Sequence, residues 1–162
     1  MGLFFIFAAM NVNAEKIVLP NELVFEEVTG LLQQGKRVTM RTKGRSMVPF
    51  IVGERDQVVL QLPVMLAVGD IVLARVPNKG YVLHRIIRLK GDYVRLMGDG
   101  NVSVTETCRT CEVCGVVTEI IRNGRVVYCA SEAERWKVKL WLFLKPVRRY
   151  ILGIGRRLGL KW

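Results

Sequence analysis

Apolar and polar residues alternate through most of the chain after Lys36, and turn signals cut this alternation into short pieces. A period of two residues is typical of β-strands. The expected strands lie at 37–42, 57–62, 70–76, 80–89, 93–97, 113–121 and 125–128. The turns between them are marked by glycine-containing groups at 68–70, 77–80, 90–92 and 122–124. The pattern predicts a mainly β domain.

One amphipathic helix is expected before this sheet, at residues 21–34. Its apolar side chains recur at the spacing of a single helix face: Val24, Val28, Leu31 and Leu32. Asn21 suits the N-cap position, and Gly35 suits the position after the last turn. The predicted organisation is an N-terminal segment at 1–19, a domain at 20–130 that includes this helix, and a tail at 131–162.

The composition fits one folded domain with a charged end. The chain has 162 residues, of which 51% are hydrophobic, so it can bury a core and is too apolar to be disordered. The net charge is +11, but residues 132–162 contain nine Lys or Arg against only Glu132 and Glu134. This asymmetry indicates an anionic partner for the tail, either lipid or nucleic acid.

The first residues admit two interpretations. Gly2 to Met10 is mostly apolar and Val12-Asn13-Ala14 is similar to a small-residue cleavage site, which favours a signal peptide within residues 1–14. No Lys or Arg precedes the apolar run, so a translation start at Met10 is the alternative. The run is too short to cross a bilayer, which takes about 20 residues.

His84 is the only histidine of the chain. A lone histidine on a strand is most often a packed core residue, but hairpin geometry here predicts a neighbour for it. Gly91-Asp92 suits a two-residue type II′ turn, which pairs Lys90 with Tyr93. Counting back along both strands places His84 opposite Asp99, and opposed Cβ atoms lie about 4.5–5.5 Å apart. The register therefore predicts a hydrogen bond between imidazole and carboxylate.

Ser46 lies in the stretch GRSMVPFIVGERD, between a glycine and a Met-x-Pro. Such a serine is most often a turn residue, but Gly44 and Pro49 could fix its backbone and turn local amides inward as oxyanion donors. If Ser46 reaches His84, the ring can take its hydroxyl proton. Asp99 would then orient the ring and stabilise the imidazolium. Ser46, His84 and Asp99 form a candidate catalytic triad.

Five motifs occur in order along the chain: Gly44-Arg45-Ser46-Met47-Val48-Pro49, Val68-Gly69-Asp70-Ile71-Val72, His84-Arg85-Ile86-Ile87, Gly98-Asp99-Gly100-Asn101 and Gly115-Val116-Val117. In these motifs the chain resembles the type I signal peptidase superfamily, in its serine–histidine branch, which shares its fold with the self-cleaving SOS repressors. The resemblance runs from residue 37 to about 125. It implies a twisted all-β catalytic fold and a serine endopeptidase that cleaves exported or precursor peptides without metal or cofactor.

The resemblance also assigns residues. Ser46 is the nucleophile, His84 stands where the bacterial branch keeps a lysine, and Asp99 matches the aspartate of the Gly-Asp-x-Asn motif. Relatives often carry a second acidic residue soon after the Gly-Asp-x-Asn motif, and Glu106 is the candidate for it here. Typical signal peptidases have a transmembrane anchor before the serine motif, and none is expected here. The alternative function is a non-catalytic β module that binds peptides in the same groove and attaches to a membrane by its tail.

The tail repeats apolar residues at helical spacing: Trp136, Leu140, Phe143, Leu144, Val147, Tyr150, Ile151, Ile154 and Leu158. Basic residues occupy other faces: Lys137, Lys145, Arg148, Arg149 and Arg156. Pro146, Gly153 and Gly155 are expected to kink or interrupt the helix.

Two interpretations of residues 136–158 remain open: a helix packed on the β domain, or a basic amphipathic helix in a membrane interface. We favour the interface, with Trp136 and Trp141 at the depth of the lipid headgroups. The charges exclude a span, so the expected attachment is peripheral and to an anionic membrane, on an unspecified side. No nucleic-acid partner is expected, because the β domain lacks a matching basic stripe with aromatic residues.

Four cysteines supply the number of ligands that a structural zinc ion takes: Cys108, Cys111, Cys114 and Cys129. Their spacing differs from the paired Cys-x-x-Cys hairpins of a zinc ribbon. Reduced or partly buried thiols are therefore expected, and a zinc-stabilised adaptor is the less favoured alternative.

Overall fold

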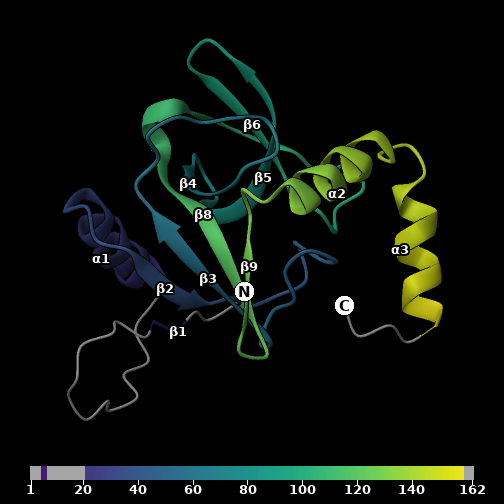
Figure 1. Ribbon diagram of the computed structural model, residues 1–162. Helices are drawn as coiled ribbons and strands as arrows, with labels where there is room; N and C mark the ends of the chain where they lie inside the picture. Colours follow the sequence, from purple (N-terminus) through teal and green to yellow (C-terminus); the bar gives the residue numbers. More distant parts are fainter. Residues whose placement is uncertain (1–4, 7–20, 159–162) are drawn as a thin grey trace.

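The fold was analysed in a computed structural model that describes residues 5–6 and 21–158. Its strands are β1 (Phe5–Ile6), β2 (Val38–Arg41), β3 (Asp56–Gln61), β4 (Ile71–Val76), β5 (Gly80–Lys90), β6 (Tyr93–Met97), β7 (Glu106–Arg109), β8 (Val113–Arg122) and β9 (Arg125–Tyr128). They form one antiparallel sheet in the order β1-β2-β3-β8-β4-β5-β6-β7, with β9 paired to β8 (Figure 1). The expected mainly β fold is confirmed.

The α-helices lie at the two ends of the described chain. Helix α1 (Asn21–Gln33) packs beside β2, and Gly35, with φ of +76°, follows its last turn (Figure 1). A short 3₁₀ helix, η1 (Thr110–Glu112), connects β7 to β8. Helices α2 (Glu132–Phe143) and α3 (Arg148–Arg157) follow β9. No helix among residues 21–158 is long and apolar enough to cross a bilayer.

Two hydrophobic clusters fill the body, one on each face of β4. Ile71 and Leu73 join the cluster that contains α1, whereas Val72 and Ala74 join the cluster under the β5–β6 hairpin. Alternate residues of a strand point to opposite faces, so both faces of β4 are buried. The sheet must curl to cover a central strand on both sides, and the five sequence motifs lie on this curled sheet and its loops.

The structure refines several boundaries and adds elements. Strands β1 and β7 were not expected; β7 is too short and polar to show a period of two. The single expected C-terminal helix is two helices, which are separated at 144–147 around Pro146. Gly153 and Gly155, in contrast, lie within α3 and do not interrupt it. The two interpretations of residues 1–14 fall outside the described residues, apart from Phe5–Ile6 in β1.

Candidate active site

Ser46 is held in the loop between β2 and β3 by the apolar side chains around it. Met47, Val48 and Ile51 are buried, and the Ile51 amide donates to the Met47 carbonyl at 2.9 Å. Ser46 itself is half-buried and lines a cavity. Gly44 has a φ of +82°, a conformation that glycine adopts without strain. The sequence of the loop therefore fixes the backbone on both sides of the serine.

Three glycines permit close backbone contacts, one within this loop and two between the loop and residues 98–100. A Cβ atom at Gly53 would lie 2.3 Å from the Gly44 carbonyl oxygen, and one at Gly98 would lie 2.5 Å from the Ser46 carbonyl oxygen. The Gly100 amide donates to the same Ser46 oxygen at 2.8 Å, and a Cβ at Gly100 would lie 2.6 Å from the Arg45 carbonyl oxygen. Only glycine permits these approaches. The Gly-Asp-Gly motif thus packs its backbone directly against the serine loop.

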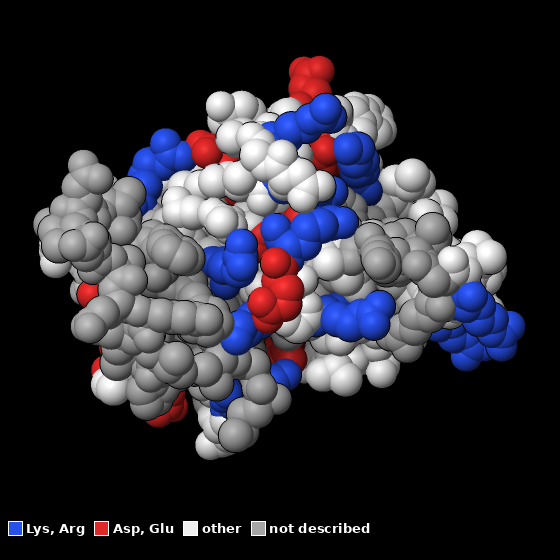
Figure 2. Space-filling model, turned by 90° about the horizontal axis from the view of Figure 1, so that it is seen from below, with Lys and Arg blue, Asp and Glu red and all other residues white. Residues whose placement is uncertain are grey.

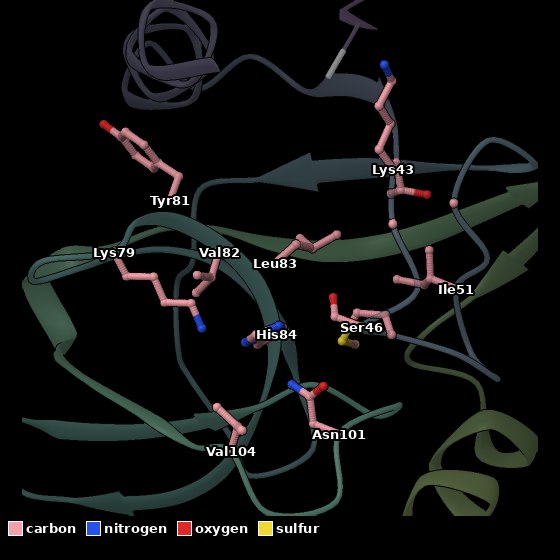
Figure 3. Close-up of a pocket in the computed structure, with 14 residues that line it drawn as sticks. Lys43, Ser46, Ile51, Lys79, Tyr81, Val82, Leu83, His84, Asn101 and Val104 are labelled. Atoms are coloured by element: carbon pink, nitrogen blue, oxygen red, sulfur yellow. The ribbon is translucent and has the colours of Figure 1, made fainter. Parts of the chain in front are cut away.

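His84 faces the same glycine from β5. Its side chain is buried, with Val72 of β4 as its partner across the sheet. A Cβ atom at Gly98 would lie 3.1 Å from His84 Nε2, and the same position is close to the Ser46 carbonyl oxygen. His84 Nε2 and the Ser46 backbone are therefore near each other, on either side of Gly98. Figure 3 shows Ser46 and His84 on facing sides of the cavity. Among the described residues no hydrogen bond joins the two side chains, and such bonds often tighten only when substrate is bound.

The carboxylate bonded to His84 belongs to Glu106. His84 Nδ1 lies 3.0 Å from Glu106 Oε2, and both side chains are buried. Glu106 opens β7 and pairs with Leu96 of β6, which brings it over the β5–β6 hairpin. With Nδ1 carrying the proton toward the carboxylate, the neutral ring presents Nε2 as an acceptor toward the serine loop.

The expected pairing of His84 with Asp99 is wrong. The two-residue turn forms as predicted, with Lys90 opposite Tyr93 and Gly91 at a φ of +57°. However, a register shift between Ile86 and Arg88 moves the partners by one residue. Such an irregularity inserts an extra residue in one strand, which turn geometry does not reveal. Beyond it, residues on the two strands no longer oppose each other as the turn predicts.

Asp99 instead binds Arg85 in a buried ion pair. Arg85 Nε lies 2.8 Å from Asp99 Oδ1 and Arg85 Nη2 lies 2.6 Å from Asp99 Oδ2, which is bidentate geometry. Arg85 Nη1 also donates to the Gly69 carbonyl at 2.6 Å, and its guanidinium lies 4.6 Å from the Phe50 ring centroid. Arg85 therefore connects three of the five sequence motifs and packs on Phe50, the residue that follows the serine motif. Asp99 holds the framework of the site, without contacting the histidine.

Burial sets the protonation of the site. Desolvation lowers the pKa of His84, and the nearby Glu106 carboxylate opposes this by favouring the imidazolium. Lys79 forms an ion pair with Glu106 Oε1, and its positive charge lowers the pKa of His84 further. Glu106 thus bridges a histidine and a lysine. The histidine is neutral at lower pH than a free imidazole, which is the form that a general base requires.

Ser46 and His84 open into a cavity of about 500 Å³. One side is formed by the serine loop with Ile51, and the other by residues 81–84 of β5 (Figure 3). Asn101 and Val104 close its lower edge in that view, and Lys79 also points into it. The arrangement combines a hydroxyl, an imidazole and a carboxylate partner beside a mixed polar and apolar cavity. These are the groups that nucleophilic attack by serine uses.

The serine loop has a further anchor that the sequence analysis missed. Asp56 is fully buried and accepts hydrogen bonds from the Val52 amide, Arg55 and Arg122. Burial alone would raise the pKa of Asp56, but the hydrogen bonds from Arg55 and Arg122 lower it below its usual value. Arg122 also donates to the Phe50 carbonyl at 2.8 Å. The Gly-Glu-Arg-Asp end of the stretch thus ties the loop to β8.

The cysteines do not converge on a metal site. Cys108 lies in the core under the hairpin, Cys114 and Cys129 pack against the core on the α1 side, and Cys111 is exposed. In the part of the chain that the structure describes, no three His, Cys, Asp or Glu residues are grouped to hold a metal ion. Burial raises the pKa of Cys108 and Cys129 to about 11, so both are protonated thiols. The alternative of a zinc site has no support in this geometry.

A buried imidazole–carboxylate pair thus lies beside the serine of a fixed loop. Residues 4–118 match the Peptidase S24-like family, and this range is well over half of the chain and contains Ser46, His84 and Glu106. The chain belongs to the Peptidase S24-like family.

One curated relative is the LexA repressor of Herpetosiphon aurantiacus. It is 34% identical over 104 residues, which are 62% of this chain and 48% of the repressor. The chain therefore spans about half the length of the curated relative that it matches. The expected superfamily is confirmed at the level of the S24-like peptidases; the relative is a repressor and not a signal peptidase.

Proposed function

We propose that this chain is a serine endopeptidase in which Ser46 is the nucleophile, His84 the general base and Glu106 the carboxylate partner of the base. The observation that carries the proposal is the buried 3.0 Å contact between His84 Nδ1 and Glu106 Oε2, with His84 Nε2 turned to the serine loop. Glu106 takes the role that the sequence analysis gave to Asp99. Membership of a peptidase family supports the same reaction class.

The reaction follows from these positions. Ser46 Oγ attacks the scissile carbonyl carbon while its proton passes to His84 Nε2, and Glu106 stabilises the imidazolium that forms. His84 then gives the proton to the leaving amine, which leaves an acyl-serine. Water, deprotonated by the same ring, cleaves this ester and regenerates Ser46. Amides of the turn shaped by Gly44 and Pro49 are the proposed donors to the oxyanion.

For the substrate, we propose a peptide segment of another, exported or precursor protein, as in the signal peptidases. The histidine at the base position and the open cavity beside Ser46 support this choice. A second candidate is cleavage of a segment of its own polypeptide, and the similarity to a LexA repressor favours it. Both candidates use the same three residues, so they differ only in the origin of the segment that enters the cavity.

Digestion of a peptide library tests the proposal and separates the candidates. The purified chain should cut a defined subset of peptides, and Ser46→Ala should cut none. Self-cleavage is detected by the mass of the chain after incubation, with Ser46→Ala mixed with active protein as the test for cleavage in trans. If neither peptides nor the chain itself are cut, while peptides still bind in the cavity, the non-catalytic peptide-binding module is correct instead.

A further inference from the structure

Helices α2 and α3 bury one face and expose a second apolar face. The inward face carries Trp141, Arg148 and Leu152, which are all buried. The outward face carries large apolar side chains at helical spacing, all exposed: Trp136, Leu140, Phe143, Val147, Tyr150, Ile154 and Leu158. A helix that packs on a domain needs only one apolar stripe. No other helix or strand of the described chain covers this outward stripe, although Leu140 at its edge also lines a cavity with Phe50 and Ile120.

The inward face joins the tail to the active-site framework. The Trp141 and Phe50 rings meet edge to face at 6.0 Å, and Phe50 in turn lies over Arg85. Arg148 stacks on Trp141 at 4.8 Å, donates to the Trp141 carbonyl at 3.1 Å and reaches Met97 Sδ at 3.8 Å. The placement of Trp141 at lipid headgroup depth is thus wrong, because this ring is used for packing. Trp136 is the exposed tryptophan of α2.

Basic residues border the outward stripe. Lys137 and Lys139 on α2 and Arg149 and Arg157 on α3 are exposed, and no Asp or Glu follows Glu134 in the sequence. Two of these cations lie against exposed aromatic rings: Lys139 over Trp136 at 5.0 Å and Arg149 over Tyr150 at 4.5 Å. Figure 2 shows Lys and Arg side chains gathered at the edge of the molecule where α3 lies. Each helix thus presents a cation beside an aromatic ring.

We propose that the outward face of α2 and α3 binds the surface of an anionic lipid bilayer. Apolar side chains flanked by Lys and Arg, with aromatic rings at the border, suit the boundary between acyl chains and negatively charged headgroups. A second copy of the chain fits less well, because it would bring two such basic faces together. Nucleic acid would match the charges and leave the exposed aliphatic side chains unmatched.

The proposed attachment is peripheral and places the peptidase body at the bilayer. Because α2 is packed on Phe50, which follows the serine motif, the active site would be held at a fixed orientation to the lipid surface. Lipid binding does not depend on Ser46, His84 or Glu106, so this proposal and the proposed peptidase activity can fail separately.

Vesicle flotation of the full chain tests the proposal. The probes are vesicles of phosphatidylcholine alone and of phosphatidylcholine with phosphatidylglycerol. We expect binding to the anionic vesicles, weakened by added salt, and a roughly tenfold or greater loss in Lys139→Gln/Arg149→Gln. The apolar variant Phe143→Glu/Ile154→Glu should lose binding at least as strongly.

Matched controls make the same changes at exposed positions elsewhere: Lys90→Gln/Arg95→Gln in the β5–β6 hairpin, and Val64→Glu/Met65→Glu in the loop after β3. These should bind within about twofold of the wild type, since they lie off the proposed surface. The proposal is overturned if the folded chain does not float with anionic vesicles, or if the controls lose binding equally. It is also overturned if the tail variants instead dissolve a dimer in light scattering or abolish binding to duplex DNA.

Discussion

Glu106 Oε2 lies 3.0 Å from His84 Nδ1, while the neighbouring Arg85 takes both oxygens of Asp99. Adjacent residues on β5 point to opposite faces of the sheet, so each binds a different acidic residue. One carboxylate can act on the imidazole, and the other stabilises the framework. The two acidic residues should therefore respond differently to the loss of their charge.

Glu106→Gln should leave the fold intact and slow the reaction of Ser46. The amide would donate a hydrogen bond to Nδ1 and favour the tautomer that lacks an acceptor at Nε2, so we expect a loss of about 10²–10⁴-fold. The measurement is the second-order rate of Ser46 acylation by a serine-directed acylating inhibitor. Glu132→Gln, an exposed change at the start of α2, is the control. Equal rates for wild type and Glu106→Gln would show that Glu106 is not the partner of the base.

Asp99→Asn should act mainly on stability. It leaves the buried Arg85 guanidinium without its counter-ion, which costs about 3–5 kcal/mol when one partner of a buried pair is removed. Urea denaturation measures this free energy of unfolding, with Asp92→Asn on the exposed turn as the control. An Asp99→Asn variant that unfolds like the wild type but no longer acylates would return Asp99 to the catalytic role.

The pH dependence should reflect a neutral, buried histidine. Burial lowers the pKa of His84 below its ordinary value of 6.5, so the acidic limb of the acylation rate should lie below pH 6.5. The unfolded chain binds this proton more readily than the folded chain. The contribution of His84 to the free energy of unfolding is therefore fully present above pH 6.5. It is lost as the pH falls through the lowered pKa that His84 has in the folded chain. A limb at or above pH 6.5 would contradict the environment described for His84.

Lys79→Met should move that limb upward. The lysine charge lowers the pKa of His84 and pairs with Glu106, so its removal leaves the imidazolium facing an unshared carboxylate. The pKa of His84 then rises, and the acylation rate at mildly acidic pH falls. Lys90→Met, at the exposed end of β5, should leave the profile unchanged. Superimposable profiles for wild type and Lys79→Met would remove Lys79 from the site.

Gly98→Ala should disturb the site because its methyl group would lie 2.5 Å from the Ser46 carbonyl oxygen and 3.1 Å from His84 Nε2. We expect a loss of about 1–3 kcal/mol in stability together with slower acylation. Gly30→Ala is the matched control, since nothing lies within 4 Å of that position in α1, and it should stabilise the fold by roughly 0.5–1 kcal/mol. Unchanged acylation in a folded Gly98→Ala protein would show that this contact does not position Ser46.

Strands and turns were largely predictable from the sequence because each leaves a local pattern. The hairpin at 90–93 and the helix at 21–34 needed only glycine positions and the spacing of apolar residues. Strand β7 could not be found in this way: its four residues alternate between buried and exposed, but one of the two buried residues is the charged Glu106, so the sequence shows no apolar period. The break around Pro146 was expected, because proline cannot continue the backbone hydrogen bonds of a helix.

The candidate site was only half predictable. Ser46 and His84 were found from their motifs. Glu106 was noted as a candidate second acidic residue, but its neighbours in space were not predicted. The exchange of Asp99 for Glu106 depends on one register shift in β5, which is set by packing across the sheet and not by the turn. Lys79 and Asp56 were missed, because their partners, Glu106 and Arg122, are far away in the sequence.

The most direct test of the account is intact mass spectrometry after reaction with an alkyl fluorophosphonate. The account predicts one adduct per chain, located at Ser46 by peptide mapping, which is absent in Ser46→Ala and strongly slowed in His84→Gln. A folded wild type that gains no adduct, or gains it at the same rate when His84 is replaced, would contradict the activation of Ser46 by His84.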